Sequence, residues 1–510
     1  MLSNYALNNK RIAINTMFLY ARMILVLIVS LYTTRVVLNA LGIVDYGIYN
    51  VVAGFVSMFA FFNTAMANSI QRFYNYVKIN NSIEQLRIVY NTAFRIQFLL
   101  AIIIFILIES FGLWYIFNKM TIPSERFFSA LLVFHFSSLS LFFLVIQVPY
   151  SASIISHEKM SFFAFASLAD VVQKLIVAIL LFNLSYDKLV LYGGLIFIVS
   201  LNNFVLYYFY AKRNFPEIKL CKYYDRTVYK EMILFAGWNT FGAFAYMIQG
   251  QGLNVLANFF FGPVVNAARG ISFQIQNAIN GFSENIATAF RPQLVESYAK
   301  KDYGRTETLM FSMSKYCFLM LAILTIPIII ELDYILNIWL NGIIPDYTQE
   351  FTVLVLINML LGALNMPISQ TVQATGKIRK YQLLRSCLVV STLPIAWIFL
   401  KLGYSPSIIF IVTIVISIVN QPLSMILLHR NFKFSYRCYC KKVLIPCIGF
   451  LTFAPILPVV FSILFEDGFI RLVFVVMLSL FSSIIIAYYL VLAKEERIVL
   501  KQFVSKLFKR

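Results

Sequence analysis

Long apolar stretches separated by short polar or Pro/Gly breaks recur along the whole chain, and they constrain its fold more than any other feature. A bilayer core of about 30 Å requires roughly 20 apolar residues per helix, and about fourteen stretches meet this length. They lie at 12–40, 47–68, 91–114, 127–150, 161–183, 188–210, 232–260, 264–290, 312–339, 351–373, 381–402, 406–428, 443–465 and 469–491. The pattern predicts an all-α integral membrane protein with about fourteen transmembrane helices.

The composition excludes a water-soluble protein. Of the 510 residues, 60% are apolar and 13% are charged, whereas a soluble domain has roughly 45–50% and about 25%. Because so few charged residues cannot cover a folded surface in water, most of the exterior must face hydrocarbon. The first apolar stretch is too long for a signal-peptide core and lacks a small-residue cleavage site, so it is predicted to be a retained helix.

Positive charge, formally +20 at pH 7, is divided unevenly between alternate loops. One set of loops, together with both termini, holds most of the Lys and Arg residues, and Arg385 is counted in this set. The opposite set holds only Lys119, Arg126, Lys188, Arg269, Lys401 and Arg471. Since Lys and Arg collect on the cytoplasmic side of membrane proteins, both termini are predicted to be cytoplasmic. Membrane orientation accounts for the charge, and no nucleic-acid partner is expected.

The two halves of the chain resemble each other at a shift of about 220 residues. This shift lays Gly42 over Gly262, and a shift of 218 matches Pro149 to Pro367 and Lys159 to Lys377. The match includes the order of the spans and the side of each loop. We therefore predict two six-helix lobes of the same orientation, with an appended pair of helices. The expected boundaries are 1–210 for the N-terminal lobe, 211–231 for a cytoplasmic linker, 232–430 for the C-terminal lobe and 431–510 for the added pair and basic tail.

Polar residues gather in the span at 264–290. Helical spacing places Arg269, Gln276, Asn280 and Ser283 on one stripe, with Gln274, Asn277 and Glu284 beside it. The preceding span, at 232–260, offers Gln249 and Asn254. Single amides often only hold helices together. So many polar groups in one span favour a water-filled cavity between the lobes.

Three further cations belong to neither set of loops and lie within predicted spans: Arg22, Arg35 and Lys174. A charge costs at least about 2.5 kcal/mol when it faces lipid, so each is expected to face a bundle interior or an aqueous cavity. Lys174 lies one turn from Asp170, and the two form either an intrahelical ion pair or a site that exchanges its internal partner for substrate charge or a proton. His135 stands alone in its span and is interpreted as a packed, hydrogen-bonded histidine rather than a ligand or a proton relay.

The sequence contains no pattern of catalytic residues. No nucleophile with a base, carboxylate pair outside the bilayer, metal constellation or G-x-x-x-x-G-K-[ST] phosphate loop occurs, and the external loops are short. We therefore expect no enzymatic activity, no cofactor and no metal. A duplicated bundle with a polar, cationic interior is typical of a secondary transporter or flippase.

The stretches TTRVVLNALGIVDYGIYNVVAG and VVNAARGISFQIQNAI, with the layout of six, six and two spans, resemble the polysaccharide flippases of the multidrug/oligosaccharidyl-lipid/polysaccharide (MOP, MATE-like) superfamily. The O-antigen type is the most similar branch. The resemblance implies a flippase of the bacterial inner membrane that moves undecaprenyl-diphosphate-linked oligosaccharide by alternating access, for O-antigen, capsule or exopolysaccharide assembly. It also implies a cationic lumen, which carries over here to Arg22, Arg35, Lys174 and Arg269.

The main alternative is a drug or metabolite exporter of the same superfamily, coupled to H⁺ or Na⁺. Such a protein relies on buried carboxylates, for which Asp170 and Glu284, and also Glu109, are the candidates. The excess of amides over buried acids favours the sugar substrate. The partners expected for a flippase are the lipid-linked oligosaccharide, the bilayer, a polysaccharide polymerase and a chain-length regulator, with the chain itself a monomer.

Overall fold

The computed structural model is all-helical over the residues that it describes, with no strand among them. The described residues are 61–78, 82–118, 123–183, 186–219, 225–261, 263–340, 344–493 and 496–497, with scattered positions between 23 and 59. The chain divides into two compact units. Unit 1 comprises Met1–Phe244 and Arg291–Lys300, and unit 2 comprises Ala245–Phe290 and Lys301–Arg510. Each unit is described by itself below.

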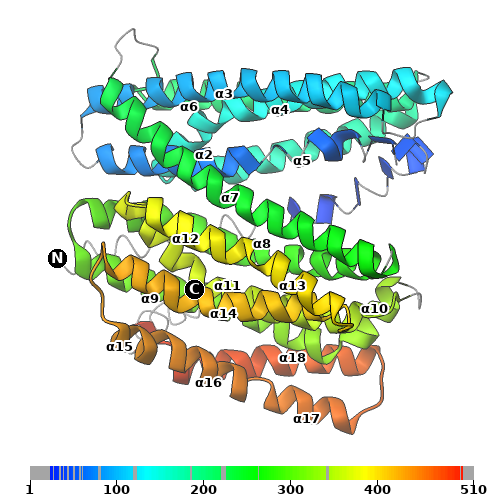
Figure 1. Cartoon of the computed structure of the whole chain (residues 1–510), viewed down its shortest axis with the longest axis vertical. Helices are drawn as coiled ribbons and strands as arrows, with labels where there is room; N and C mark the ends of the chain where they lie inside the picture. The colour runs from blue at the N-terminus through cyan, green and yellow to red at the C-terminus, as the bar shows by residue number, and fades with distance from the viewer. Residues whose placement is uncertain are drawn as a thin grey trace, which may run out of the picture. The chain divides into compact units, whose positions relative to one another are not determined.

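Unit 1 is built around a central helix, α4, which packs against four other helices of the same unit (Figure 1). The helices concerned are α2 (Phe61–Val77), α3 (Ile83–Asn118), α4 (Phe127–Ser156), α5 (Met160–Asn183) and α6 (Lys188–Asn214). A Cβ added at Gly112 of α3 would overlap the ring of Phe134 on α4. The absence of a side chain at Gly112 therefore lets these two helices approach closely, as small residues do between membrane helices.

Two long helices contribute residues to both units: α7 (Arg226–Phe261) and α8 (Pro263–Ala299). The remaining helices belong to unit 2. They are α9 (Tyr303–Ile330), α10 (Leu332–Leu340), α11 (Thr348–Thr375), α12 (Arg379–Val390), α13 (Thr392–Lys401), α14 (Ile408–His429), α15 (Tyr436–Tyr439), α16 (Ile445–Phe453), α17 (Ile456–Leu464) and α18 (Phe469–Ile486). Short π-helical segments precede α16 and follow α18.

The predicted fold class, an all-α membrane protein, is confirmed. In the described part of the chain, 10 helical segments are long and apolar enough to cross a membrane. Helices α7 and α8 have 36 and 37 residues and are long enough, but they are more polar. Most of the first predicted span, 12–40, and several positions of the second, 47–68, lie outside the described residues. The predicted count of about fourteen agrees roughly with this inventory.

Several helices differ in length from the apolar stretches that predict them. Helix α3 extends from residue 83 to residue 118, because polar residues continue the helix beyond the stretch at 91–114. The stretch at 312–339 is divided at Glu331, four residues after Pro327, and the stretch at 381–402 is divided at Ser391. Hydropathy reports where a chain is apolar, and it does not report where a helix bends.

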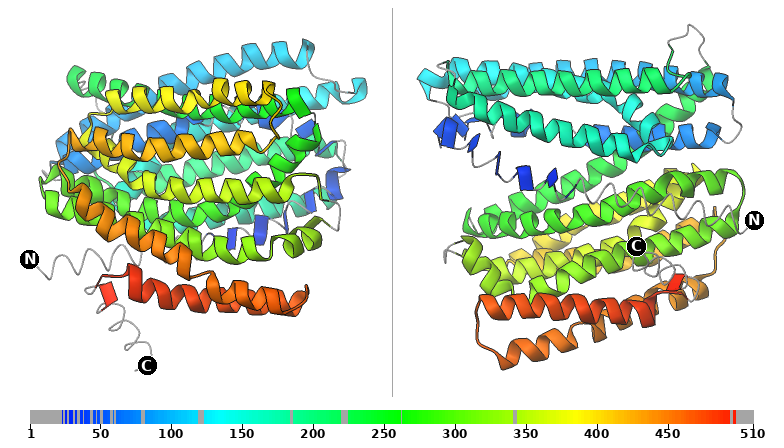
Figure 2. Two further views of the ribbon diagram at one scale, coloured as in Figure 1. Left: turned by 60° about the horizontal axis from the view of Figure 1, so that its bottom comes forward. Right: turned by 180° about the vertical axis from the view of Figure 1, so that it is seen from behind.

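Two buried ion pairs attach the last helices to α9 within unit 2. Arg471 of α18 donates to both carboxylate oxygens of Glu331, with its Nη2 2.9 Å from Oε2. Lys315 of α9 lies 2.8 Å from Oε2 of Glu496, beyond the other end of α18. Helices α17 and α18 lie side by side (orange and red in Figure 2). The appended pair is therefore held to α9 at both of its ends.

The turn after α4 anchors the segment that follows α6. His157 stacks on Phe215, with ring centroids 4.3 Å apart, and its Nδ1 donates to the carbonyl of Ser153. Its Nε2 lies 3.4 Å from Oε1 of Glu217, a carboxylate that is 2% exposed. Burial lowers the pKa of His157 to about 4 and raises the pKa of Glu217. The imidazole is therefore neutral at neutral pH.

Acidification is expected to weaken this anchor. Because the folded state depresses the pKa of His157 from 6.5 to about 4, the ring contributes stability above pH 6.5 and loses it as the pH falls toward 4. The loss amounts to at most about 3 kcal/mol. Thermal unfolding of the wild type and His157→Phe should be compared between pH 7 and pH 4. The phenylalanine keeps a ring against Phe215. Glu217 is present in both proteins, and its raised pKa makes stability change with pH in the opposite direction, so its contribution cancels in the comparison. The wild type should lose more stability, and parallel pH profiles would contradict the prediction.

Candidate functional site

Unit 1 contains a cavity of about 530 Å³ between α4, α5 and α6. Its polar lining combines one carboxylate, one ammonium group, two amides and several hydroxyls. These groups belong to Asp170, Lys174, Gln147, Asn203, Ser137, Ser140, Ser167 and Ser200. Aliphatic side chains and the rings of Tyr49 and Tyr207 complete the wall. A cavity with few charged groups and many hydrogen-bonding groups is suited to a polar ligand.

The charged groups of this cavity are already paired. Lys174 Nζ lies 2.8 Å from Oδ2 of Asp170, four residues earlier on α5. Asn203 of α6 donates to the other oxygen, Oδ1, at 2.7 Å. Both carboxylate oxygens are thus satisfied, whereas the ammonium group has three donors and its side chain is 44% exposed. The intrahelical pair that the sequence offered as one alternative is present, and the exposed partner in it is the cation.

Unit 2 contains a second polar region, around Arg269 of α8. Its Nη1 donates to Oδ1 of Asn254 at 3.1 Å, and its Nη2 donates to the carbonyl of Gly250 at 2.9 Å. The guanidinium also lies over the ring of Phe273, 4.5 Å from the centroid. Its Nε is enclosed and has no hydrogen-bond partner. Arg269 forms no ion pair with any residue that the structure describes, so its charge is met only by neutral groups.

The other polar residues of α8 do not form one uniform face. Gln274, Asn277 and Glu284 are exposed, Gln276 and Asn280 are half-buried, and Ser283 is buried with its hydroxyl unpartnered. On α7, Gln249 donates to Oγ1 of Thr392 at 3.0 Å. This amide therefore holds α7 to α13. Arg22 and Arg35, the remaining predicted site residues, lie outside the described part of the chain.

Two features of the structure were missed by the sequence interpretation. His135 is not alone: its Nδ1 lies 2.9 Å from Oε2 of Glu109 on α3, and Ser138 donates to the same carboxylate. The sequence interpretation expected a hydrogen-bonded histidine but did not identify its partner, because that partner lies on a neighbouring helix. Arg385 was counted among cytoplasmic charges, although it lies within α12. The sequence signal for the first feature was the presence of two ionisable residues, His135 and Glu109, in adjacent apolar spans.

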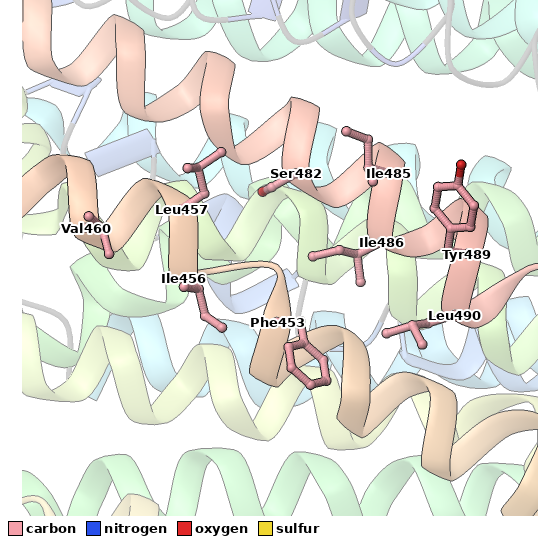
Figure 3. Close-up of a pocket in the computed structure, with 9 residues that line it drawn as sticks. All are labelled: Phe453, Ile456, Leu457, Val460, Ser482, Ile485, Ile486, Tyr489 and Leu490. Carbon is pink, nitrogen blue, oxygen red and sulfur yellow. The ribbon is translucent and has the colours of Figure 1, made fainter.

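An apolar groove of about 450 Å³ lies between α16, α17 and α18 in unit 2. Figure 3 shows the side chains that line it, among them Phe453, Leu457, Ile486 and Leu490. The hydroxyl of Ser482 donates to the carbonyl of Ala454, so this polar group is satisfied within the hairpin. A groove with this lining on a membrane hairpin is compatible with hydrocarbon chains. The described residues contain no group of three His, Cys, Asp or Glu residues that could hold a metal ion.

Comparison with known proteins identifies the fold. No family model matches the chain, and no curated protein matches its sequence. Among solved structures, MATE in the bent conformation has a TM-score of 0.70 at 15% identity, covering 83% of this chain and 96% of that one. A MOP superfamily transporter from Pyrococcus furiosus gives 0.66 at 15% identity, with 82% and 96% covered. A multidrug resistance MATE family transporter in an outward-facing conformation gives 0.64 at 16% identity, with the same coverage.

These similarities and the ten apolar helices define a class. The protein is a multi-pass membrane protein with the MATE-like fold of MOP superfamily transporters. The fold agrees with the superfamily to which the sequence patterns pointed. At this level of identity it carries no information on the substrate.

Proposed function

We propose that this chain is a flippase that moves undecaprenyl-diphosphate-linked oligosaccharide across the bacterial inner membrane by alternating access. The product would feed the assembly of a surface polysaccharide such as O-antigen, capsule or exopolysaccharide. The chain would act as a monomer with cytoplasmic termini, alongside a polysaccharide polymerase and a chain-length regulator. It would have no catalytic activity of its own.

The observation that carries this proposal is the charge on Arg269. A guanidinium within a membrane bundle is costly unless a carboxylate or another anion meets it. Arg269 has an amide, a backbone carbonyl and an aromatic ring as its neighbours. Its geometry suits two parallel hydrogen bonds to phosphate oxygens, which a lipid diphosphate offers. An anionic substrate would supply the charge that the described residues do not.

The carbohydrate part of the substrate would meet amides and hydroxyls. Gln274 and Asn277 are exposed on α8, and Gln147 and four serines line the cavity of unit 1. Amide side chains both donate and accept hydrogen bonds, as sugar hydroxyls do. The polar groups of each unit, taken separately, therefore support a carbohydrate ligand. Lys174 adds an exposed ammonium group to the same cavity.

The second candidate function is a multidrug or metabolite exporter coupled to H⁺ or Na⁺. The description of one structural neighbour as a multidrug resistance transporter and the position of Asp170 in a cavity favour it. However, Lys174 and Asn203 satisfy both oxygens of Asp170. A sodium ion or a cationic drug would have to displace the ammonium group, which makes this site a poor cation receptor. The exposed Glu284, and Glu109 beside His135, remain the other carboxylates on which coupling could depend.

Transport in liposomes distinguishes the two functions. Purified protein should move a fluorescent undecaprenyl-diphosphate oligosaccharide from the inner to the outer leaflet, made visible by a glycosidase or lectin added outside. Extrusion of a cationic dye should be measured in the same vesicles. Dye extrusion without movement of the lipid-linked glycan would assign the chain to the exporters instead. Release of undecaprenyl diphosphate, or lengthening of the glycan, would indicate an enzyme.

The pair on α5 provides a separate prediction. If Lys174 binds substrate, Lys174→Ala should lower glycan transport about tenfold, since one charge-assisted contact is lost. Adding Asp170→Asn should not restore transport, although it removes the carboxylate left unpaired by the first change. Initial rates should be compared for both single variants and the double variant. Recovery in the double variant would mean that the pair only neutralises itself.

A further inference from the structure

A second guanidinium of unit 2 lies within a membrane helix. Arg385 follows the start of α12 by about one and a half turns. Its Nη1 donates to the hydroxyl of Ser369 on α11 at 3.1 Å. Its Cζ lies 5.0 Å from the ring centroid of Tyr246 on α7 and 5.5 Å from that of Tyr381 on α12. Helices α7, α11 and α12 therefore all contribute to its surroundings.

Arg385, like Arg269, is met only by neutral groups. It forms no ion pair with a residue in the described part of the chain, and its Nε is enclosed without a hydrogen-bond partner. The residue as a whole is half-buried. The hydroxyls of Ser369, Tyr246 and Tyr381 are its hydrogen-bonding neighbours, and none of them brings a negative charge to the five N–H donors of the guanidinium. A guanidinium in a membrane segment that no carboxylate neutralises calls for an anion.

The contacts of both arginines fall on one stripe of α7. Arg385 contacts Tyr246, and Arg269 contacts Gly250 and Asn254. These positions are four residues apart, so they lie above one another on the same helix face. At a rise of 1.5 Å per residue, they are separated by roughly 6 Å and roughly 12 Å along the axis. A phosphate group could pass from one guanidinium to the other without losing a cationic partner.

The order of the two arginines follows from the helices that carry them. Helix α12 starts on the side predicted to be cytoplasmic, and Arg385 lies near that start. Helix α8 starts on the side predicted to be external, and Arg269 lies near its start. Along α7, the contact with Arg385 is likewise nearer the predicted cytoplasmic end. An anion that enters from the cytoplasm would therefore reach Arg385 first.

We propose that Arg385, with Tyr246, Tyr381 and Ser369, forms a second anion site, which binds the phosphate groups of the lipid-linked substrate before they reach Arg269. This inference rests on the proposed function, because it assumes a phosphate-bearing substrate. The tyrosine rings line the site with aromatic faces, and the Arg385 fork supplies the hydrogen bonds. Ser369 acts as a positioning residue through its bond to Nη1.

Binding of farnesyl diphosphate to the full chain in phosphatidylcholine nanodiscs tests the site directly. Arg385→Gln should weaken binding about tenfold, as the loss of a charge-assisted contact does. Arg385→Lys, which keeps the charge but not the fork, should weaken it less. Arg437→Gln is the matched control, since Arg437 is exposed on α15 and outside the site. Equal affinity in the wild type and both Arg385 variants, with unchanged melting curves, would overturn the proposal.

Two further arms identify the source of the anion. Inorganic pyrophosphate should compete for the Arg385-dependent binding, because the phosphate groups are what the site recognises. Nanodiscs of phosphatidylglycerol should leave that binding in place. Its abolition would show that ordinary anionic lipid occupies the site and would overturn the assignment to the substrate. A protein that binds farnesyl diphosphate through Arg385 and yet moves no glycan would contradict the proposed function and leave the anion site standing.

Discussion

Arg269→Ala is expected to reduce the export of lipid-linked oligosaccharide about a hundredfold or more, with normal membrane insertion. Two hydrogen bonds to phosphate oxygens, each assisted by charge, would be lost together, and about 3 kcal/mol corresponds to more than a hundredfold. Arg269→Lys should retain part of the activity, because it keeps the charge without the planar fork. The measurement is the initial rate of glycan transport in liposomes, normalised to the amount of inserted protein.

Stability should respond differently from transport in this variant. Removing Arg269 leaves two acceptors without their donor, the amide oxygen of Asn254 and the carbonyl of Gly250. No carboxylate in the described part of the chain is left unpaired. The desolvation cost of the guanidinium disappears at the same time. Thermal unfolding should therefore stay unchanged or shift upward, as is common when a residue is kept for function. Arg437→Ala serves as a control for loss of one positive charge. Unchanged export by Arg269→Ala would remove this residue from the site.

The helices that could be predicted best are those whose ends coincide with the ends of an apolar stretch. Helix α5 was expected at 161–183 and runs from Met160 to Asn183, and α6 begins at Lys188 as expected. The Asp170–Lys174 pair belongs to the same category, because a spacing of four residues on a helix fixes its geometry. In each case, the information lies within one turn or one span.

The features that escaped prediction depend on neighbours that are distant in sequence. Asn203 donates a hydrogen bond to Asp170 from another helix, and Glu109 pairs with His135 across the α3–α4 contact. Hydrophobic periodicity gives the face of a helix that is polar, but it does not identify the helix opposite. The same reason explains Arg385. Its position near the start of the stretch at 381–402 matches a charge at the cytoplasmic end of a span, and only the packing of α7, α11 and α12 places it against Ser369 and Tyr246.

The buried pair between Glu331 and Arg471 is expected to be the largest single contribution of an ion pair to the stability of unit 2. The Glu331 side chain is 0% exposed and that of Arg471 is 12% exposed, and Arg471 also pairs with Asp467. Glu331→Ala leaves a buried guanidinium with one exposed partner, which should lower the free energy of unfolding by about 3 to 5 kcal/mol. Replacing both residues by methionine should cost much less, because no unpaired charge then remains.

Thermal unfolding in detergent measures these changes, and the exposed pair Lys300–Glu296 provides the matched control. Its side chains are 51% and 38% exposed, so Glu296→Ala should change stability by less than about 1 kcal/mol. Because Arg471 joins α18 to the junction of α9 and α10, Glu331→Ala should also loosen the hairpin that forms the apolar groove. Faster hydrogen exchange in α17 and α18, with α11 and α14 unaffected, would locate the effect there. A melting curve like that of the wild type would mean that apolar packing alone holds the appended pair to α9.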